Sequence, residues 1–238
     1  MIMNINKITE KFKNIDIQLN ERQAEQFSIY YKELCIWNDK INLTSILEED
    51  AVLMKHFVDS LLSTKVIDYK DVKRLIDVGT GAGFPGIPIK IVYPHIEVVL
   101  LDALSKRVIF LDHVIEKLDL NGISAVHGRA EDLARTDLRE SFDLCVSRAV
   151  SQLNVLCEYC LPFISNNGLF ISYKGNKTIE ELEQSKNAIS ILGGKVESVV
   201  DNIVLDASTN RGFVIIRKES ITDVKYPRRA GKPLKRPL

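Results

Sequence analysis

The sequence predicts an α/β fold: a seven-stranded, mostly parallel sheet with helices on both faces and an N-terminal helical extension. After about residue 70, short β-rich runs alternate with helical patterns, which is typical of βαβ units. A glycine-rich turn follows the first of these runs, as in doubly wound sheets. The chain has 238 residues, 45% of them hydrophobic, which suffices for one such domain and an extension.

The N-terminal extension is expected to cover residues 1–70. Between about residues 20 and 37, apolar residues recur at helical spacing, at Ala24, Phe27, Leu34 and Trp37. Asn20 can cap the start of this helix through its side-chain oxygen. A second helix is predicted over about residues 48–66.

The expected domain, residues 71–220, follows with seven β-rich runs. Strands are predicted at residues 74–78, 97–101, 123–126, 142–146, 169–173, 195–204 and 212–217. Helices are predicted at residues 85–92, 105–118, 152–161 and 178–192. The last two strands have no helix between them, so they should pair antiparallel at the sheet edge. This reversal fits the Rossmann-like class I methyltransferase variant better than the six-stranded dinucleotide-binding form.

The loop after the first strand predicts a ligand site. Residues 75–86 read Leu-Ile-Asp-Val-Gly-Thr-Gly-Ala-Gly-Phe-Pro-Gly, a buried strand that runs into a glycine-rich turn and a helix. Glycines such as Gly79 and Gly81 let the backbone turn sharply and approach a ligand. We therefore expect a nucleotide-like ligand at the carboxyl end of this strand.

Acidic residues near this loop favour S-adenosylmethionine as that ligand. Asp77 stands two residues before Gly79, where a carboxylate can face the cationic methionine end directly or through water. Asp102 ends the second strand about 20 residues past the loop and can accept hydrogen bonds from both ribose hydroxyls. Glu131 and Asp132 follow the third strand, where such folds hold adenine, although acids there also suit a helix N-terminus.

Two other interpretations of the loop remain. Residues 81–86 match GxGxxG literally, which admits a nicotinamide-dependent or flavin-dependent oxidoreductase. Such an enzyme needs a substrate domain, yet the sheet uses the residues that follow the loop. A non-catalytic module that binds S-adenosylmethionine or RNA is the second alternative, and detection of methyl transfer would exclude it.

The region after the fourth strand bears on which atom is methylated. It reads Cys-Val-Ser-Arg-Ala over residues 145–149, without the Asn-Pro-Pro-Tyr-like element of exocyclic amine methyltransferases. Cys145 lies in an apolar strand, which disfavours its use as a nucleophile for carbon methylation. A ring nitrogen such as guanine N7 attacks through its own lone pair, so no general base is required. The catalytic residues are left unknown, with Arg148 and Lys174 as positioning candidates.

Cysteine usage predicts no metal site. Cys157 and Cys160 form the only close pair, within a helical pattern and without a second pair or nearby histidines. Buried, reduced thiols are therefore expected.

The expected tail, residues 221–238, is strongly basic. Residues 224–238 contain six basic residues and no acid: Lys225, Arg228, Arg229, Lys232, Lys235 and Arg236. Removing these six from 32 basic residues leaves 26 against 32 acidic residues in the rest of the chain. A positive tail on a negative body predicts binding to a polyanion. Because Pro227, Pro233 and Pro237 disfavour a helix, we expect an extended segment that orders on RNA, with a structural strap that closes over the sheet as the alternative.

Several segments together resemble the ribosomal RNA small-subunit methyltransferase G family (RsmG), formerly called glucose-inhibited division protein B (GidB). The resemblance spans nearly the whole chain. It rests on Trp37-Asn38 with Asn42-Leu43-Thr44, residues 56–61 (His-Phe-Val-Asp-Ser-Leu), residues 77–86, Ser147-Arg148-Ala149, Tyr173-Lys174-Gly175 and residues 226–238.

The resemblance implies a substrate and a set of site residues. It implies methyl transfer from S-adenosylmethionine to N7 of guanine 527, in the 530 loop of 16S rRNA, with S-adenosylhomocysteine as product. It also implies that the cofactor contacts Gly79, Phe84, Asp102, Ala103, Leu104, Ala130, Glu131 and Arg148. Arg148 is placed to reach either the cofactor's carboxylate or the target base.

Contact with RNA is expected at basic residues outside the cofactor loop. The candidates are His56, Lys174, Arg211, Arg228, Arg229 and Lys235. Naked 16S rRNA, an assembly intermediate and the mature small subunit are all open as partners, and a monomer is expected. The sequence lacks a run of about 18 apolar residues and a secretory signal, so a cytoplasmic protein without membrane contact is expected.

Overall fold

A computed structural model describes residues 3–175, 177–206 and 209–238. Its sheet has seven strands in the order β3-β2-β1-β4-β5-β7-β6, and β7 pairs antiparallel with both β5 and β6. The strands are β1 (Arg74–Val78), β2 (Glu97–Asp102), β3 (Ile123–His127), β4 (Phe142–Arg148), β5 (Ile164–Lys174), β6 (Gly194–Asp206) and β7 (Thr209–Lys218). The other pairs are parallel, so the predicted fold class and the antiparallel edge are confirmed.

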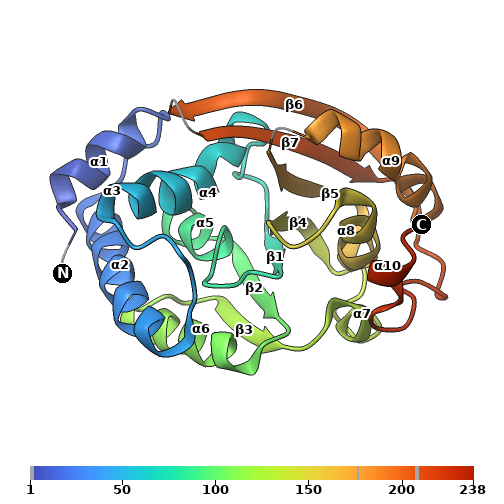
Figure 1. Cartoon of the computed structure of the whole chain (residues 1–238), viewed down its shortest axis with the longest axis horizontal. Helices are drawn as coiled ribbons and strands as arrows, with labels where there is room; N and C mark the ends of the chain where they lie inside the picture. Colours follow the sequence, from blue (N-terminus) through green and yellow to red (C-terminus); the bar gives the residue numbers. More distant parts are fainter. Residues whose placement is uncertain (1–2, 176, 207–208) are drawn as a thin grey trace.

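Helices cover both faces of this sheet (Figure 1). They are α5 (Gly86–Val92), α6 (Ser105–Lys117), α7 (Ala130–Leu133), α8 (Leu153–Cys160), η3 (Leu161–Phe163) and α9 (Thr178–Ile191). One apolar core joins the sheet to α5, α6 and the N-terminal helices, with Ile87, Phe110 and Phe57 fully buried. A second core joins the other face to α8 and α9 and includes Leu156 and Ile189.

The N-terminal extension is helical, but it differs from the prediction in two respects. A first helix, α1 (Ile5–Lys13), was missed because it is short; Asn4 caps it and only its Ile8 and Phe12 are buried. The single helix predicted over residues 48–66 is a continuous run of changing pitch: α3 (Glu49–Val52), the π-helical turn η1 (Leu53–Val58), α4 (Asp59–Leu61) and the 3₁₀ turn η2 (Leu62–Lys65). The long helix α2 (Glu21–Ile41) begins at Asn20 with a capping box, as predicted.

The register of the parallel strands brings the predicted site residues to one edge. Val78, the last residue of β1, lies opposite Leu101 of β2, and Asp102 lies opposite His127 of β3. The glycine loop, the end of β2 and the start of α7 therefore meet at the carboxyl ends of three neighbouring strands.

Residues 222–238, the C-terminal segment, are folded against the domain. Pro227 and Pro233 are buried, and α10 (Lys232–Lys235) lies beside α8 (Figure 1). The prediction of an extended tail is wrong for these residues: Pro233 sits in the first turn of α10, where a missing N–H costs no helical hydrogen bond. No helix formed by residues 3–175, 177–206 and 209–238 has both the length and the apolarity to span a membrane.

Candidate cofactor-binding site

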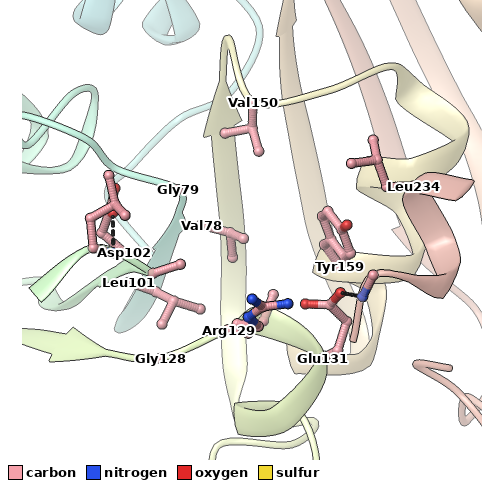
Figure 2. Close-up of a pocket in the computed structure, with 14 residues that line it drawn as sticks. Val78, Gly79, Leu101, Asp102, Gly128, Arg129, Glu131, Val150, Tyr159 and Leu234 are labelled. Carbon is pink, nitrogen blue, oxygen red and sulfur yellow. Dashed lines mark hydrogen bonds between the residues drawn. The ribbon is translucent and has the colours of Figure 1, made fainter. Parts of the chain in front are cut away.

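A cavity of about 320 Å³ opens at the carboxyl ends of β1, β2 and β3. Figure 2 shows Asp102 and Gly79 on one side of it, and Tyr159 and Leu234 on the other. The lining residues come from the glycine loop, the two following strand ends, α8 and the C-terminal segment: Val78, Gly79, Leu101, Asp102, Ala103, Leu104, Gly128, Arg129, Ala130, Glu131, Val150, Tyr159, Gly231 and Leu234.

The glycine loop has the backbone conformation that its sequence predicts. Gly79 and Gly83 have φ values of 74° and 96°, a region that side chains disfavour. A side chain at Gly79 would also collide with Val150 across the cavity mouth. The Gly79 N–H donates to the carbonyl of Leu101 at 2.8 Å, which ties the loop to the end of β2.

Asp102 is held in one orientation at the base of the cavity. Its side chain is buried; Oδ2 accepts from the Gly81 N–H and Oδ1 from the Leu104 N–H, each at 2.9 Å. Arg107 lies 3.3 Å from Oδ2. An ionised carboxylate accepts about four hydrogen bonds, so Asp102 retains capacity for a ligand hydroxyl.

Asp77 lies behind the loop and does not line the cavity. Its Oδ2 accepts from the Thr80 hydroxyl at 2.7 Å and from the Gly86 N–H at 2.8 Å. Among the described residues, its buried Oδ1 has no hydrogen-bond partner. Burial raises the pKa of Asp77 to about 7, although these two hydrogen bonds oppose the shift. Asp77 thus offers one unsatisfied acceptor beside the glycine loop.

Glu131 occupies the opposite end of the cavity and is buried. Its Oε1 accepts from the Gly231 N–H at 2.9 Å, the dashed line beside Glu131 in Figure 2. Burial, followed by the negative charges of Glu131 and Glu158, raises the pKa of Tyr159 to about 12. Apolar side chains dominate the wall between Glu131 and Asp102, which suits a flat, uncharged ring system.

The structure gathers most of the predicted cofactor residues, but not all of them. Gly79, Asp102, Ala103, Leu104, Ala130 and Glu131 line the cavity, and Gly81 is bonded to Asp102. Phe84 and Arg148 lie outside the lining. Sequence reasoning did not select Arg129, Val150, Tyr159, Gly231 or Leu234. Arg129 and Val150 stand just past the ends of β3 and β4, whereas Tyr159, Gly231 and Leu234 reach the cavity only through tertiary packing.

Phe84 belongs to an aromatic stack between the glycine loop and the N-terminal helices. Its ring lies 4.7 Å from that of His56 and 5.3 Å from that of Tyr30, and the Arg148 guanidinium lies 5.2 Å from its centroid. The Nε2 of His56 is 2.9 Å from the Thr44 hydroxyl. Burial, and then the charge of Arg148, lowers the pKa of His56 to about 4, so its ring is neutral near pH 7.

Outside the C-terminal segment, three of the predicted basic residues are held in ion pairs. Asp59, fully buried, binds Arg148 through Oδ2 at 2.5 Å and Arg211 through Oδ1 at 2.6 Å. Lys174 pairs with Glu181 at 2.7 Å and donates to the Ser151 carbonyl at 3.0 Å. Asp59 thus joins α4 to β4 and β7, and the pair of Lys174 with Glu181 joins β5 to α9.

The predicted cations of the C-terminal segment differ in environment. Arg228 forms a bidentate pair with Glu158, whose side chain is 1% exposed. Arg229 and Lys235 are exposed, and neither has an ion-pair partner in the described parts of the chain. The described residues also contain no group of three or more His, Cys, Asp or Glu that is placed to hold a metal.

Comparison with known proteins identifies relatives over nearly the whole length of the chain. The sequence profile of the family described as GidB, rRNA small subunit methyltransferase G, matches residues 23–205. A "Ribosomal RNA small subunit methyltransferase G" from Lachnoclostridium phytofermentans is 49% identical over 227 residues, 95% of this chain and 94% of that protein. One of the same name from Staphylococcus carnosus is 46% identical over 238 residues and 99% of both chains.

Solved structures share the fold at low sequence identity. Cofactor-bound Rv0187 from MTB has a TM-score of 0.58 at 15% identity, covering 81% of this chain and 91% of that one. M. jannaschii TYW2 in complex with AdoMet has a TM-score of 0.54 at 15% identity, covering 73% of this chain and 77% of that one. At such identities the likeness shows the fold alone.

Proposed function

The chain belongs to the rRNA small subunit methyltransferase G family, and from this premise we propose that it methylates N7 of guanine 527 in the 530 loop of 16S rRNA with S-adenosylmethionine as methyl donor. The observation that carries the proposal is the cavity at the carboxyl ends of β1, β2 and β3, with Asp102 at one end and Glu131 at the other. The substrate is 16S rRNA, free or in a small-subunit particle.

The donor set of the cavity fits S-adenosylmethionine. A volume of about 320 Å³ is within the range of small-ligand sites. Asp102 has acceptor capacity for ribose hydroxyls, and the apolar wall accommodates adenine beside Glu131. Gly79 lines the cavity with a φ of 74°, so its backbone can approach the ligand without a side chain of its own in the way.

In this proposal the residues position the reactants and no side chain removes a proton. S-adenosylmethionine supplies an electrophilic methyl group when bound, and guanine N7 already carries a lone pair. We assign positioning to Arg148, Lys174 and Arg211, which are fixed by ion pairs with Asp59 and Glu181. Phe84 and His56 form an apolar, uncharged surface beside Arg148. Binding of RNA phosphates is assigned to exposed cations such as Arg229 and Lys235.

The two alternatives are less well supported by the site. A nicotinamide cofactor brings a diphosphate, yet the cavity has two buried carboxylates and Arg129 as its basic residue. A non-catalytic module requires no positioned residues beside the cofactor, whereas Arg148 is held by a buried carboxylate next to the glycine loop.

Methyl transfer in vitro tests the proposal. The purified chain is incubated with methyl-labelled S-adenosylmethionine and 16S rRNA or small subunits from cells that lack the modification, and labelled nucleosides are identified. We expect 7-methylguanosine. Cofactor binding without label transfer to any RNA form would favour the non-catalytic module, and a methyl on carbon or an exocyclic amine would contradict the assignment to N7.

A further inference from the structure

The outer part of the C-terminal segment contributes directly to the cofactor cavity. Gly231 and Leu234 line it, although they lie more than 100 residues past the glycine loop in the sequence. In Figure 2, Leu234 projects from α10 toward the cavity from the side opposite to Asp102. The same short segment carries the exposed cations Arg229, Lys232, Lys235 and Arg236.

The inner part of the C-terminal segment is firmly attached to the domain. Arg139 donates to the carbonyl of Thr222 at 2.6 Å and to that of Tyr226 at 3.0 Å. Arg135 donates to the carbonyl of Pro227. The bidentate pair of Arg228 with buried Glu158 completes these contacts. Residues 222–228 therefore form a fixed base for residues 229–236.

Residues 229–236 are attached by far fewer contacts. Among the described residues, the Gly231 N–H to Glu131 bond is the hydrogen bond that ties them to the body, and Pro233 is their buried side chain. Gly231 has a φ of 77°, and a Cβ built there would meet nothing within 4 Å. To move away from the cavity, this part would release the bond of Gly231 to Glu131 and the packing of Leu238 against the second core, which are few contacts compared with those of residues 222–228.

The rim of the cavity is apolar and exposed. Leu234 is 63% exposed, Leu104 45% and Val150 39%, although all three line the cavity. A ligand that fills the cavity would remove apolar surface of all three side chains from water. Cofactor binding therefore favours the position in which α10 lies over the cavity.

We propose that residues 229–236 form a lid over the cofactor cavity, and that RNA phosphates bound to its cations hold this lid closed. The inference rests on the proposed function, because it takes S-adenosylmethionine and rRNA as the two ligands. Closure by either ligand favours binding of the other, and the coupling is reciprocal. The enzyme would then retain its cofactor most tightly when the substrate is bound.

The first test removes the apolar contact of the lid. Leu234→Ala should weaken binding of S-adenosylmethionine by about 3- to 10-fold in calorimetry of the full-length protein. Val224→Ala is the matched control, since Val224 is an exposed aliphatic residue of the same segment outside the cavity. Its affinity should equal that of the wild type. An unchanged affinity in Leu234→Ala, with an unchanged melting temperature, would overturn the lid.

The second test measures the coupling. Affinity for S-adenosylmethionine is determined with and without a saturating transcript of the 530 loop. We expect the transcript to tighten cofactor binding about fivefold or more in the wild type. The triple variant Lys232→Gln, Lys235→Gln, Arg236→Gln, at a transcript concentration that still saturates it, should lose most of this gain. Lys225→Gln, which changes a cation paired with Asp223 away from the cavity, should keep it.

The outcomes separate the lid from the underlying function. If the wild type does not bind S-adenosylmethionine at all, the proposed function fails and the lid with it. If it binds and methylates RNA, but the transcript leaves cofactor affinity unchanged, only the lid is contradicted. A gain that persists in the triple variant would likewise contradict the role assigned to these cations.

Discussion

Asp102 is the residue on which the cofactor assignment depends most. Its carboxylate binds Gly81 and Leu104 and retains acceptor capacity toward the cavity. Asp102→Ala should weaken binding of S-adenosylmethionine by about 1.5–3 kcal/mol, because hydrogen bonds to a charged acceptor are lost. Calorimetry measures this change. Asp132→Ala, which alters an exposed acid outside the cavity lining, is the control, and equal affinities in both variants would contradict the role of Asp102.

Asp77 should make stability depend on pH in an unusual direction. Burial raises its pKa from 3.8 to about 7, so the folded state binds this proton more tightly than the unfolded state. The resulting stabilisation is complete below about pH 4 and is lost as the pH rises through 7. Its size is on the order of 4 kcal/mol, from three pKa units.

Urea unfolding of the wild type and of Asp77→Asn between pH 4 and 8 isolates this effect. The free energy of unfolding of the wild type relative to the variant should fall over this range. His56 contributes the opposite slope below about pH 6.5, because its pKa is lowered to about 4, but it is present in both proteins and cancels. A constant difference between the two proteins would show that Asp77 has an ordinary pKa.

Sequence alone predicted the site residues that stand at or just after the end of a strand. Asp77, Asp102 and Glu131 each stand at or just after a β-rich run, and parallel strands bring such positions to one edge. Leu234 and Tyr159 could not be found in this way, because nothing local distinguishes a cavity-lining leucine or tyrosine from a packed one. Phe84 was in the right loop, but its ring packs on His56 and Tyr30, outside the cavity lining.

Among the elements, the C-terminal segment is one whose conformation periodicity and composition do not predict. Six cations without acids predict an extended segment that orders on RNA, yet Arg228 pairs with Glu158 of α8 and Thr222 is buried. The pair of Arg228 with Glu158 joins residues that are far apart in the sequence, which composition does not reveal. The π-helical turn η1 was not predicted for a different reason. Over six residues, its apolar spacing differs little from that of an α-helix.

Two adjacent arginines should differ strongly in their effect on stability. Arg228→Ala leaves the carboxylate of Glu158 buried without its partner, so the free energy of unfolding should fall by about 3–5 kcal/mol. Arg229→Ala removes an exposed side chain and should change it by less than about 0.5 kcal/mol. Urea unfolding at neutral pH measures both. Similar values for the two variants would mean that the segment is not held as described.

At the scale of the whole molecule, the charge of the tail should act on RNA through salt-dependent contacts. Replacing Arg229, Lys232, Lys235 and Arg236 together by glutamine removes exposed cations while the pair of Arg228 with Glu158 remains. The log-log slope of RNA affinity against salt should flatten by up to about 3, at roughly 0.7 per phosphate contact. Filter binding at salt concentrations from about 50 to 300 mM measures this log-log slope. An unchanged slope would place the RNA surface outside the C-terminal segment.

The fold as a whole was the most predictable property. Seven β-rich runs and the helices between them specify a doubly wound sheet, and the absence of a helix between the last two runs specifies its antiparallel edge. Which nucleotide is modified does not follow from sheet topology, because the same fold carries many substrates. That step rests on membership of the family and on the site.

The proposed methylation of guanine 527 is tested most directly by mass mapping of 16S rRNA from cells with and without this protein. Nuclease fragments that contain position 527 are compared by mass, and the modified nucleoside is identified. We expect 7-methylguanosine at position 527 in the presence of the protein and unmodified guanosine in its absence. The wild type should restore the modification, but Asp102→Ala should not at limiting cofactor. The proposed function would be contradicted by a fragment whose methylation is the same with and without the protein, or by a methyl group that appears at another nucleotide.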